Sequence, residues 1–79
     1  MIVLDTNVLS EVLRPAPEAR VLVWLASWPR SALFTTTVTR GEIFYGVRLL
    51  PEGRRRDGLL QAVRGMFAED FAGQVLAFD

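Results

Sequence analysis

The stretch Ile2-Val3-Leu4-Asp5-Thr6-Asn7 decides the fold class of this 79-residue chain. Its first three residues are a short apolar run with two β-branched side chains, which is typical of a strand buried in a parallel sheet. The run stops at residue types that favour turns and helix N-termini. The chain is therefore predicted to begin with a buried strand that leads directly into a helix.

The same alternation of strands and helices continues along the chain. Apolar residues recur at helical spacing as far as Arg14-Pro15, and a second helix is predicted over 17–28. Strands are predicted over 32–37 and 75–78, with a helix starting at Thr39 and another over 54–71 between them. Connections of this length favour parallel strands joined by right-handed crossovers. We therefore predict an α/β fold with about three strands and four helices.

The predicted sheet is short for this class of fold. Open α/β sheets usually contain about five or six strands, and the third predicted strand ends next to Asp79, the last residue of the chain. The expectation is that residues 1–79 form the N-terminal portion of a single domain, with the C-terminal portion absent from this chain.

Composition narrows the chemistry open to the chain. An apolar content of 51% excludes an intrinsically disordered chain. The absence of cysteine and histidine excludes disulfide bonds, thiol nucleophiles, a Ser-His-Asp triad and zinc sites built from thiolate or imidazole. Nine arginines balance nine acidic residues, so a strongly basic nucleic-acid-binding surface is not expected. The chain shows no signal peptide or membrane span, so a cytoplasmic protein is expected.

Asp5 is the first candidate for a functional residue. It follows a predicted parallel strand, and ligands of open α/β sheets bind at the carboxyl ends of the strands. A carboxylate at this place can bind a metal ion. It can equally accept hydrogen bonds from the first backbone N–H groups of the next helix as an N-cap residue. Both interpretations remain open at this point.

Glu42 is the second candidate. If its helix packs across the same end of the sheet, its carboxylate approaches that of Asp5, and a hard divalent cation relieves the repulsion between them. The alternative is structural, because Thr39 and Glu42 have the spacing of a capping box, with Thr39 as the N-cap. Glu42 would then bind the start of its own helix.

Three further features have alternative explanations. The run Arg54, Arg55 and Arg56 is either a solvated helix face or a contact surface for an RNA backbone. Trp24 and Trp28 lie one helical turn apart and form either part of the core or a partner-binding face. A glycine at position 46 is unfavourable inside a helix, so the close approach of another backbone or a ligand is plausible there.

Two motifs together resemble a known family. The opening over 2–11 resembles the start of PIN-domain ribonuclease toxins of the VapC type, and the block over 36–46 resembles the second motif of that family. The stretches over 50–57, 71–73 and 75–79 are closest to the FitB-like subgroup. The agreement extends along the whole chain in the correct order.

The resemblance implies a three-layer α/β/α fold with a parallel sheet, and an endoribonuclease that uses Mg²⁺ or Mn²⁺ in a type II toxin–antitoxin pair. Asp5 and Glu42 correspond to two metal-binding catalytic acids, with Thr6, Asn7 and Thr39 in supporting roles. Expected partners are a cognate antitoxin, the RNA substrate, and either a second copy or a complementing C-terminal fragment. The family strand order 3-2-1-4-5 would leave the first strand at a sheet edge in this chain.

Two departures from the family pattern affect these expectations. Gly41 stands where a helix-favouring residue such as alanine is common. The remaining site acids of the family lie in the C-terminal portion, and Asp79 is placed as a helix cap rather than as a metal ligand. The alternative functions are an inactive antitoxin-binding module and a non-functional truncation product. A haloacid dehalogenase is excluded because position 7 is Asn7, where that chemistry needs a second aspartate.

Overall fold

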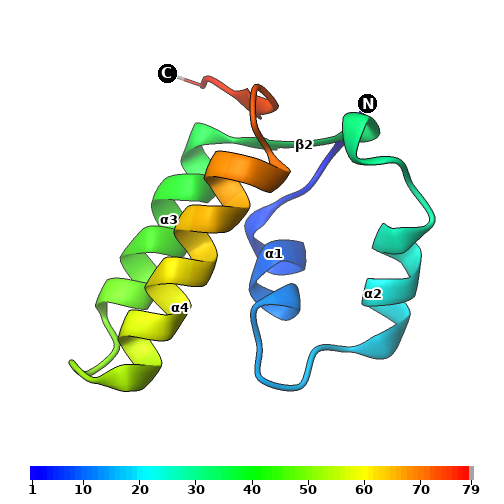
Figure 1. Cartoon of the computed structure of the whole chain (residues 1–79). Coiled ribbons are helices and arrows are strands. Elements are labelled where there is room, and N and C mark those ends of the chain that lie inside the picture. Colours follow the sequence, from blue (N-terminus) through cyan, green and yellow to red (C-terminus); the bar gives the residue numbers. More distant parts are fainter. Residues whose placement is uncertain (79) are drawn as a thin grey trace.

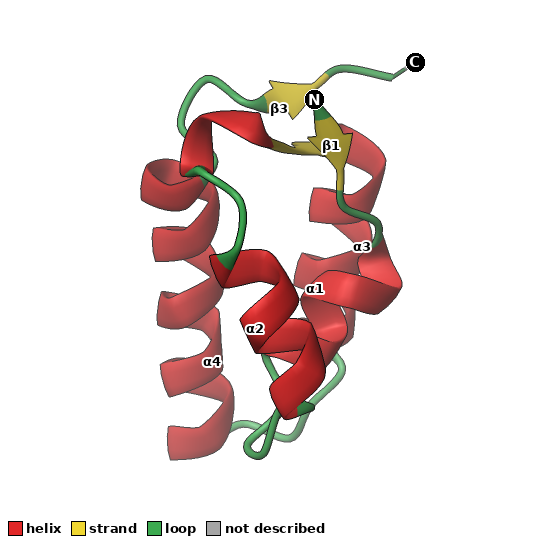
Figure 2. Cartoon of the chain, turned by 90° about the vertical axis from the view of Figure 1, so that its right-hand side faces the viewer, coloured by secondary structure: helices red, strands yellow, loops and turns green. Residues whose placement is uncertain are grey.

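A three-stranded parallel sheet lies at one end of the molecule, and the helices extend from it (Figures 1 and 2). The structure, a computed structural model, describes residues 1–78. Within them, no helix is long and apolar enough to cross a membrane. The predicted three strands and four helices are confirmed. The elements are β1 (Ile2–Val3), α1 (Thr6–Val12), α2 (Ala19–Ala26), the 3-10 turn η1 (Arg30–Ala32), β2 (Leu33–Thr36), α3 (Thr37–Arg48), α4 (Arg54–Gly65), the π-helical turn η2 (Met66–Asp70) and β3 (Val75–Leu76).

The strands follow the order β1-β2-β3, and both pairings are parallel. The first half of β2 pairs with β1, where Ile2 is opposite Leu33, and its second half pairs with β3. The backbone N–H of Leu4 extends the first pairing by donating to the carbonyl of Phe34 at 2.7 Å. Within residues 1–78, β1 is therefore an edge strand, which agrees with the strand order that the resemblance implied.

Several predicted boundaries were wrong. The second helix begins at Ala19 and not at Pro17, and its N-cap residue Glu18 makes no side-chain cap. The third strand ends at Leu76, because only its first two residues pair with β2. The helix predicted over 54–71 is α-helical only to Gly65 and then widens into η2.

The wide turn η2 places aromatic side chains in the core. The backbone N–H of Phe71 donates to the carbonyl of Met66, five residues earlier, at 3.0 Å. Phe67 packs between Phe44 and Phe71, with ring centroids 5.8 and 6.0 Å away. These rings complete a core that is formed by Leu4 at the end of β1 and by residues of α1, α3, α4 and η2. Its buried members are Leu4, Leu9, Ile43, Val47, Val63, Met66, Phe67 and Phe71.

Helix α2 lies apart from α3 and α4, beside α1 (Figure 1). Trp24 of α2 and Trp28, two residues after the end of that helix, stack edge to face with ring centroids 6.5 Å apart. Each remains 42% exposed, so core packing does not account for them.

Thr35 of β2 is bonded through its buried hydroxyl to the residue that follows β1. Its side chain is fully buried, and Oγ1 donates a 3.0 Å hydrogen bond to the carbonyl of Leu4. Leu4 is the residue before Asp5, so this bond fixes the point where β1 leads into α1. A buried carbonyl that loses its partner is costly, which makes the hydroxyl of Thr35 a structural requirement.

We expect Thr35→Val to lower the free energy of unfolding by about 1–3 kcal/mol, because it leaves the carbonyl of Leu4 without a donor. Urea denaturation followed by circular dichroism measures this change. Thr35→Ser retains the hydroxyl and serves as the control for a change of side chain at this position. Equal stability of the valine variant and the parent chain would contradict the assigned bond.

Candidate metal centre

Asp5 stands between β1 and α1, at the carboxyl end of the edge strand. It is exposed and has an extended backbone, and its Oδ1 accepts a hydrogen bond from the backbone N–H of Val8 at 3.1 Å. The capping interpretation of Asp5 is thereby confirmed. Because the cap uses only one carboxylate oxygen, Oδ2 remains available to a ligand.

The capping-box alternative for Glu42 was wrong. The N-cap of α3 is Thr36, whose Oγ1 accepts from the backbone N–H of Thr39 at 3.0 Å. The helix therefore begins at Thr37, directly after β2, and Thr39 is a buried residue of its first turn. Glu42 lies six residues after this N-cap, too far along α3 to bond back to it. Its carboxylate therefore does not cap the helix.

Thr6, the residue after Asp5, is bonded directly to Glu42. Its Oγ1 donates a 2.8 Å hydrogen bond to Oε1 of Glu42, although the two residues are 36 positions apart in the sequence. The hydroxyl oxygens of Thr6 and Thr39 are 3.4 Å apart. The hydroxyl of the residue next to Asp5 therefore positions the carboxylate of Glu42 at the carboxyl end of β1.

Asn7 does not join this group of side chains. It is exposed on the first turn of α1, and within residues 1–78 its side chain forms no hydrogen bond. The supporting role predicted for Thr6 and Thr39 has a geometric basis, whereas that of Asn7 remains a prediction from the resemblance alone.

The three arginines at the start of α4 differ in their surroundings. Arg56 is partly buried, and its Nη1 lies 3.9 Å from Oε1 of Glu52, so its charge is already paired with an acid. Arg55 lines a pocket that also includes Glu42, and Arg54 does not. Arg14 lines the same pocket and was missed by the sequence analysis, which treated Arg14-Pro15 only as a helix end. No signal in the sequence pointed to it, because the pocket forms only when α1, α3 and α4 pack together.

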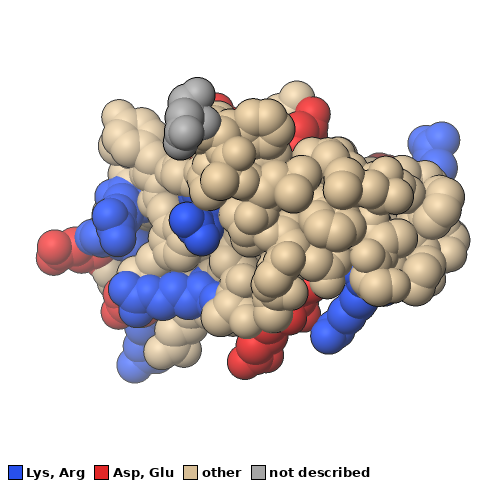
Figure 3. Space-filling model, turned by 90° about the horizontal axis from the view of Figure 1, so that it is seen from above, with Lys and Arg blue, Asp and Glu red and all other residues tan. Residues whose placement is uncertain are grey.

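The charges on the molecule are otherwise mixed. Figure 3, which views the sheet end, shows a largely uncharged face with blue and red side chains interspersed toward its margins. This face of the molecule therefore carries no broad basic surface.

The available donors suit a hard divalent cation. The free oxygens of Asp5 and Glu42 are carboxylate ligands of the type that Mg²⁺ and Mn²⁺ prefer, and Mg²⁺ typically keeps several waters beside one or two carboxylates. Within residues 1–78, however, no group of three acidic residues gathers closely enough to surround an ion. Asp79, predicted as a helix cap, lies outside the described residues. Within residues 1–78, Asp5 and Glu42 thus offer oxygen donors of a suitable kind but no complete set of ligands.

Comparison with known proteins gives consistent relatives. The chain is 40% identical over 79 residues to the plasmid stability protein StbB of Pseudomonas syringae pv. tomato and to toxin FitB of Neisseria gonorrhoeae. It is 37% identical to VapC ribonuclease Y4jK of Sinorhizobium fredii. Each match covers the whole chain but only 56–57% of the relative, so the chain spans little more than half the length of these proteins.

Solved structures and a family profile agree with these relatives. The fold superposes with a TM-score of 0.91 on FitAB bound to a DNA fragment and of 0.90 on FitAcB from Neisseria gonorrhoeae, at 40% identity in both cases. The whole chain is covered, together with 55% and 57% of those chains. The profile of the PIN domain matches residues 2–79. The resemblance found in the motifs is confirmed, and the chain belongs to the PIN-domain family.

Proposed function

We propose that this chain contributes Asp5 and Glu42 to the active site of a cytoplasmic endoribonuclease toxin that depends on Mg²⁺ or Mn²⁺. The observation that supports the proposal is the hydrogen bond from Thr6, the residue after Asp5, to the carboxylate of Glu42 near the carboxyl end of β1. Ligands of open α/β folds bind at this edge of the sheet. The toxin and ribonuclease names among the relatives support the same class of activity.

Each residue has a separate task in this site. Asp5 is held in place by its cap bond to Val8 and presents Oδ2 to the ion. Glu42 is oriented by Thr6 through Oε1 and presents Oε2. A divalent ion held by Asp5 and Glu42 would supply an activated water and would neutralise charge on the phosphodiester. The buried position of Thr39 beside Thr6 keeps the two helices in register.

Two carboxylates alone form a weak site for an ion that requires near-octahedral geometry. Further ligands would come from a second copy of the chain or from a complementing C-terminal segment, since the relatives are longer than this chain. A cognate antitoxin would regulate the toxin by covering the acidic site.

Cleavage of mixed single-stranded RNA in Mn²⁺ tests the proposal, with EDTA as the metal-free control. We expect Glu42→Gln to reduce Mn²⁺-dependent cleavage at least about 100-fold, because the loss of even an outer-sphere partner of a metal site commonly costs 10–100-fold. Glu69→Gln is the matched control, since Glu69 is an exposed acid outside this site.

A Mn²⁺ titration followed by thermal denaturation provides a second readout that does not need turnover. A ligand that binds only the folded state raises the melting temperature, and Glu42→Gln should remove that increase. Cleavage and Mn²⁺ stabilisation that are both insensitive to Glu42 would refute the assignment of the site.

An antitoxin-binding module without activity is the second candidate function. It is favoured by the absence of a third acid near the pair within the described residues. A pull-down with the antitoxin encoded beside this chain, run in parallel with the cleavage assay, distinguishes the two. Binding without cleavage supports the module, and metal-dependent cleavage supports the enzyme.

A further inference from the structure

A pocket of about 260 Å³ lies next to the acid pair, between α1, α3 and α4. Glu42 lines it, and so does Gly46 one helical turn further along α3. The remaining lining is mostly apolar side chains, contributed mainly by Leu13, Ile43, Val47 and Leu59. Glu42 therefore borders an open, largely apolar pocket.

Two guanidinium groups from different elements belong to this pocket. Arg14 follows α1 and Arg55 lies in the first turn of α4. Within residues 1–78, Arg55 forms no ion pair, so its charge is available to an incoming anion. The pocket thus combines an apolar lining with two positive groups and an acid site.

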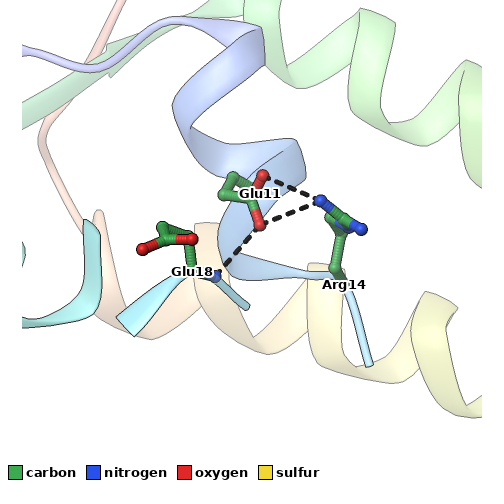
Figure 4. Close-up of polar contacts among 3 residues, drawn as sticks. All are labelled: Glu11, Arg14 and Glu18. Carbon is green, nitrogen blue, oxygen red and sulfur yellow. Dashed lines mark hydrogen bonds and ion pairs between the residues drawn. The ribbon is translucent and has the colours of Figure 1, made fainter. Parts of the chain in front are cut away.

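Glu11 holds Arg14 in position, as Figure 4 shows. Its two carboxylate oxygens accept from Nη1 of Arg14 at 3.1 and 3.3 Å, and Oε2 also accepts from the backbone N–H of Glu18 at 3.1 Å. The same carboxylate closes the loop between α1 and α2. Because only Nη1 is used, Nη2 and Nε of Arg14 can donate to a ligand.

We propose that this pocket is a nucleotide subsite that receives one unpaired base of single-stranded RNA, with neighbouring phosphates on Arg14 and Arg55. The class of ligand rests on the proposed function. Single-stranded RNA is recognised through splayed bases placed in apolar or guanidinium-lined surroundings, together with arginine contacts to phosphate. The volume is at the small end of ligand pockets, which suits one base rather than a larger group.

The position of Glu42 favours RNA over a peptide as the occupant. A strand whose phosphate lies at Asp5 and Glu42 must continue past Glu42, and the pocket begins at that residue. Two arginines then meet the repeated negative charges of the same strand. A peptide has no charge on its backbone, so it would engage the two arginines only through acidic side chains.

Gly46 offers a way to fill the pocket without disturbing the core. Apart from its chain neighbours and its own helix backbone, a Cβ atom built on it meets no atom within 4 Å. The same holds for Gly58 in α4, which does not line the pocket. Gly46→Leu therefore adds bulk inside the subsite, and Gly58→Leu adds the same bulk elsewhere. Both substitutions favour the helical state, since glycine is costly in a helix interior.

The test measures binding of a labelled six-nucleotide RNA to the 79-residue chain by fluorescence anisotropy in EDTA. Under these conditions no metal-dependent step contributes. We expect Arg14→Gln combined with Arg55→Gln to weaken binding at least tenfold and to lower the slope of log K against log salt by about 1.4, at about 0.7 per lost single-strand phosphate contact. Arg48→Gln combined with Arg64→Gln changes the net charge equally and is expected to have little effect.

The base itself is tested with the bulk variants and with an abasic strand. We expect Gly46→Leu to weaken binding while Gly58→Leu does not, and the abasic strand to bind the parent chain more weakly than the intact RNA. Circular dichroism verifies that each variant is folded.

The subsite would be overturned if the parent chain did not bind the RNA. It would also be overturned if the two double arginine variants lost affinity equally, or if the abasic strand bound as tightly as the intact RNA. Pocket variants that weaken binding only of an acidic, apolar peptide would overturn it too. The RNA-binding assay contains no metal, so its result does not depend on the outcome of the cleavage test. The two proposals can therefore fail separately.

Discussion

Phe67→Ala is expected to lower the free energy of unfolding by about 3–5 kcal/mol, the range for removing a buried aromatic side chain. Phe67 lies in η2 with its side chain packed between the rings of Phe44 and Phe71. Its removal costs both the apolar surface and the two ring contacts, and it leaves a cavity. A domain of this size has about 5–15 kcal/mol in total, so the variant should be close to unfolding at 37 °C.

Urea denaturation at 25 °C measures this change. Phe78→Ala is the matched control, because it removes the same side chain from a position that is 58% exposed, and we expect a change within about 0.5 kcal/mol. Similar losses in both variants would show that Phe67 does not occupy the centre of the core.

Asp5→Asn should separate the two tasks of Asp5. Asparagine caps a helix about as well as aspartate, so metal-free stability should stay within about 0.5 kcal/mol of the parent chain. The charge that holds the ion is lost, and we expect Mn²⁺-dependent cleavage to fall at least about 100-fold. Asp5→Ala loses the cap as well and should cost a further 0.5–2 kcal/mol, typically about 1 kcal/mol.

Thermal denaturation with and without Mn²⁺, run beside the cleavage assay, measures both tasks on the same samples. We expect both variants to lose the stabilisation by Mn²⁺, and only Asp5→Ala to melt earlier without metal. Full cleavage by Asp5→Asn would instead make Asp5 a capping residue only.

Local sequence signals were sufficient to predict β1 and the residues around it. Three apolar residues followed by Asp5 indicate a strand, a cap and a helix, and the structure has all three in that order. The spacing of apolar residues likewise predicted the number and order of the other elements. These features depend on neighbours in the sequence, which a pattern can reveal.

The start of α3 could not be predicted, because several threonines there could serve as N-cap. Tertiary packing chooses among them, since Thr35 is buried against Leu4 and Thr36 is left to cap the helix. The bond between Thr6 and Glu42 also depends on how α1 and α3 pack, which no local pattern contains. The same is true of Arg14 and Arg55, whose shared pocket is formed by three helices.

The wide turn η2 has a consequence for how this chain tolerates changes of length. A π-helical turn accommodates one residue more than an α-helix would over the same rise. Deleting one residue there would restore a regular helix but rotate Phe71 by about 100°, away from the core that it shares with Phe67. A one-residue deletion in this segment is therefore expected to cost the chain about as much as the loss of one of its core aromatic side chains.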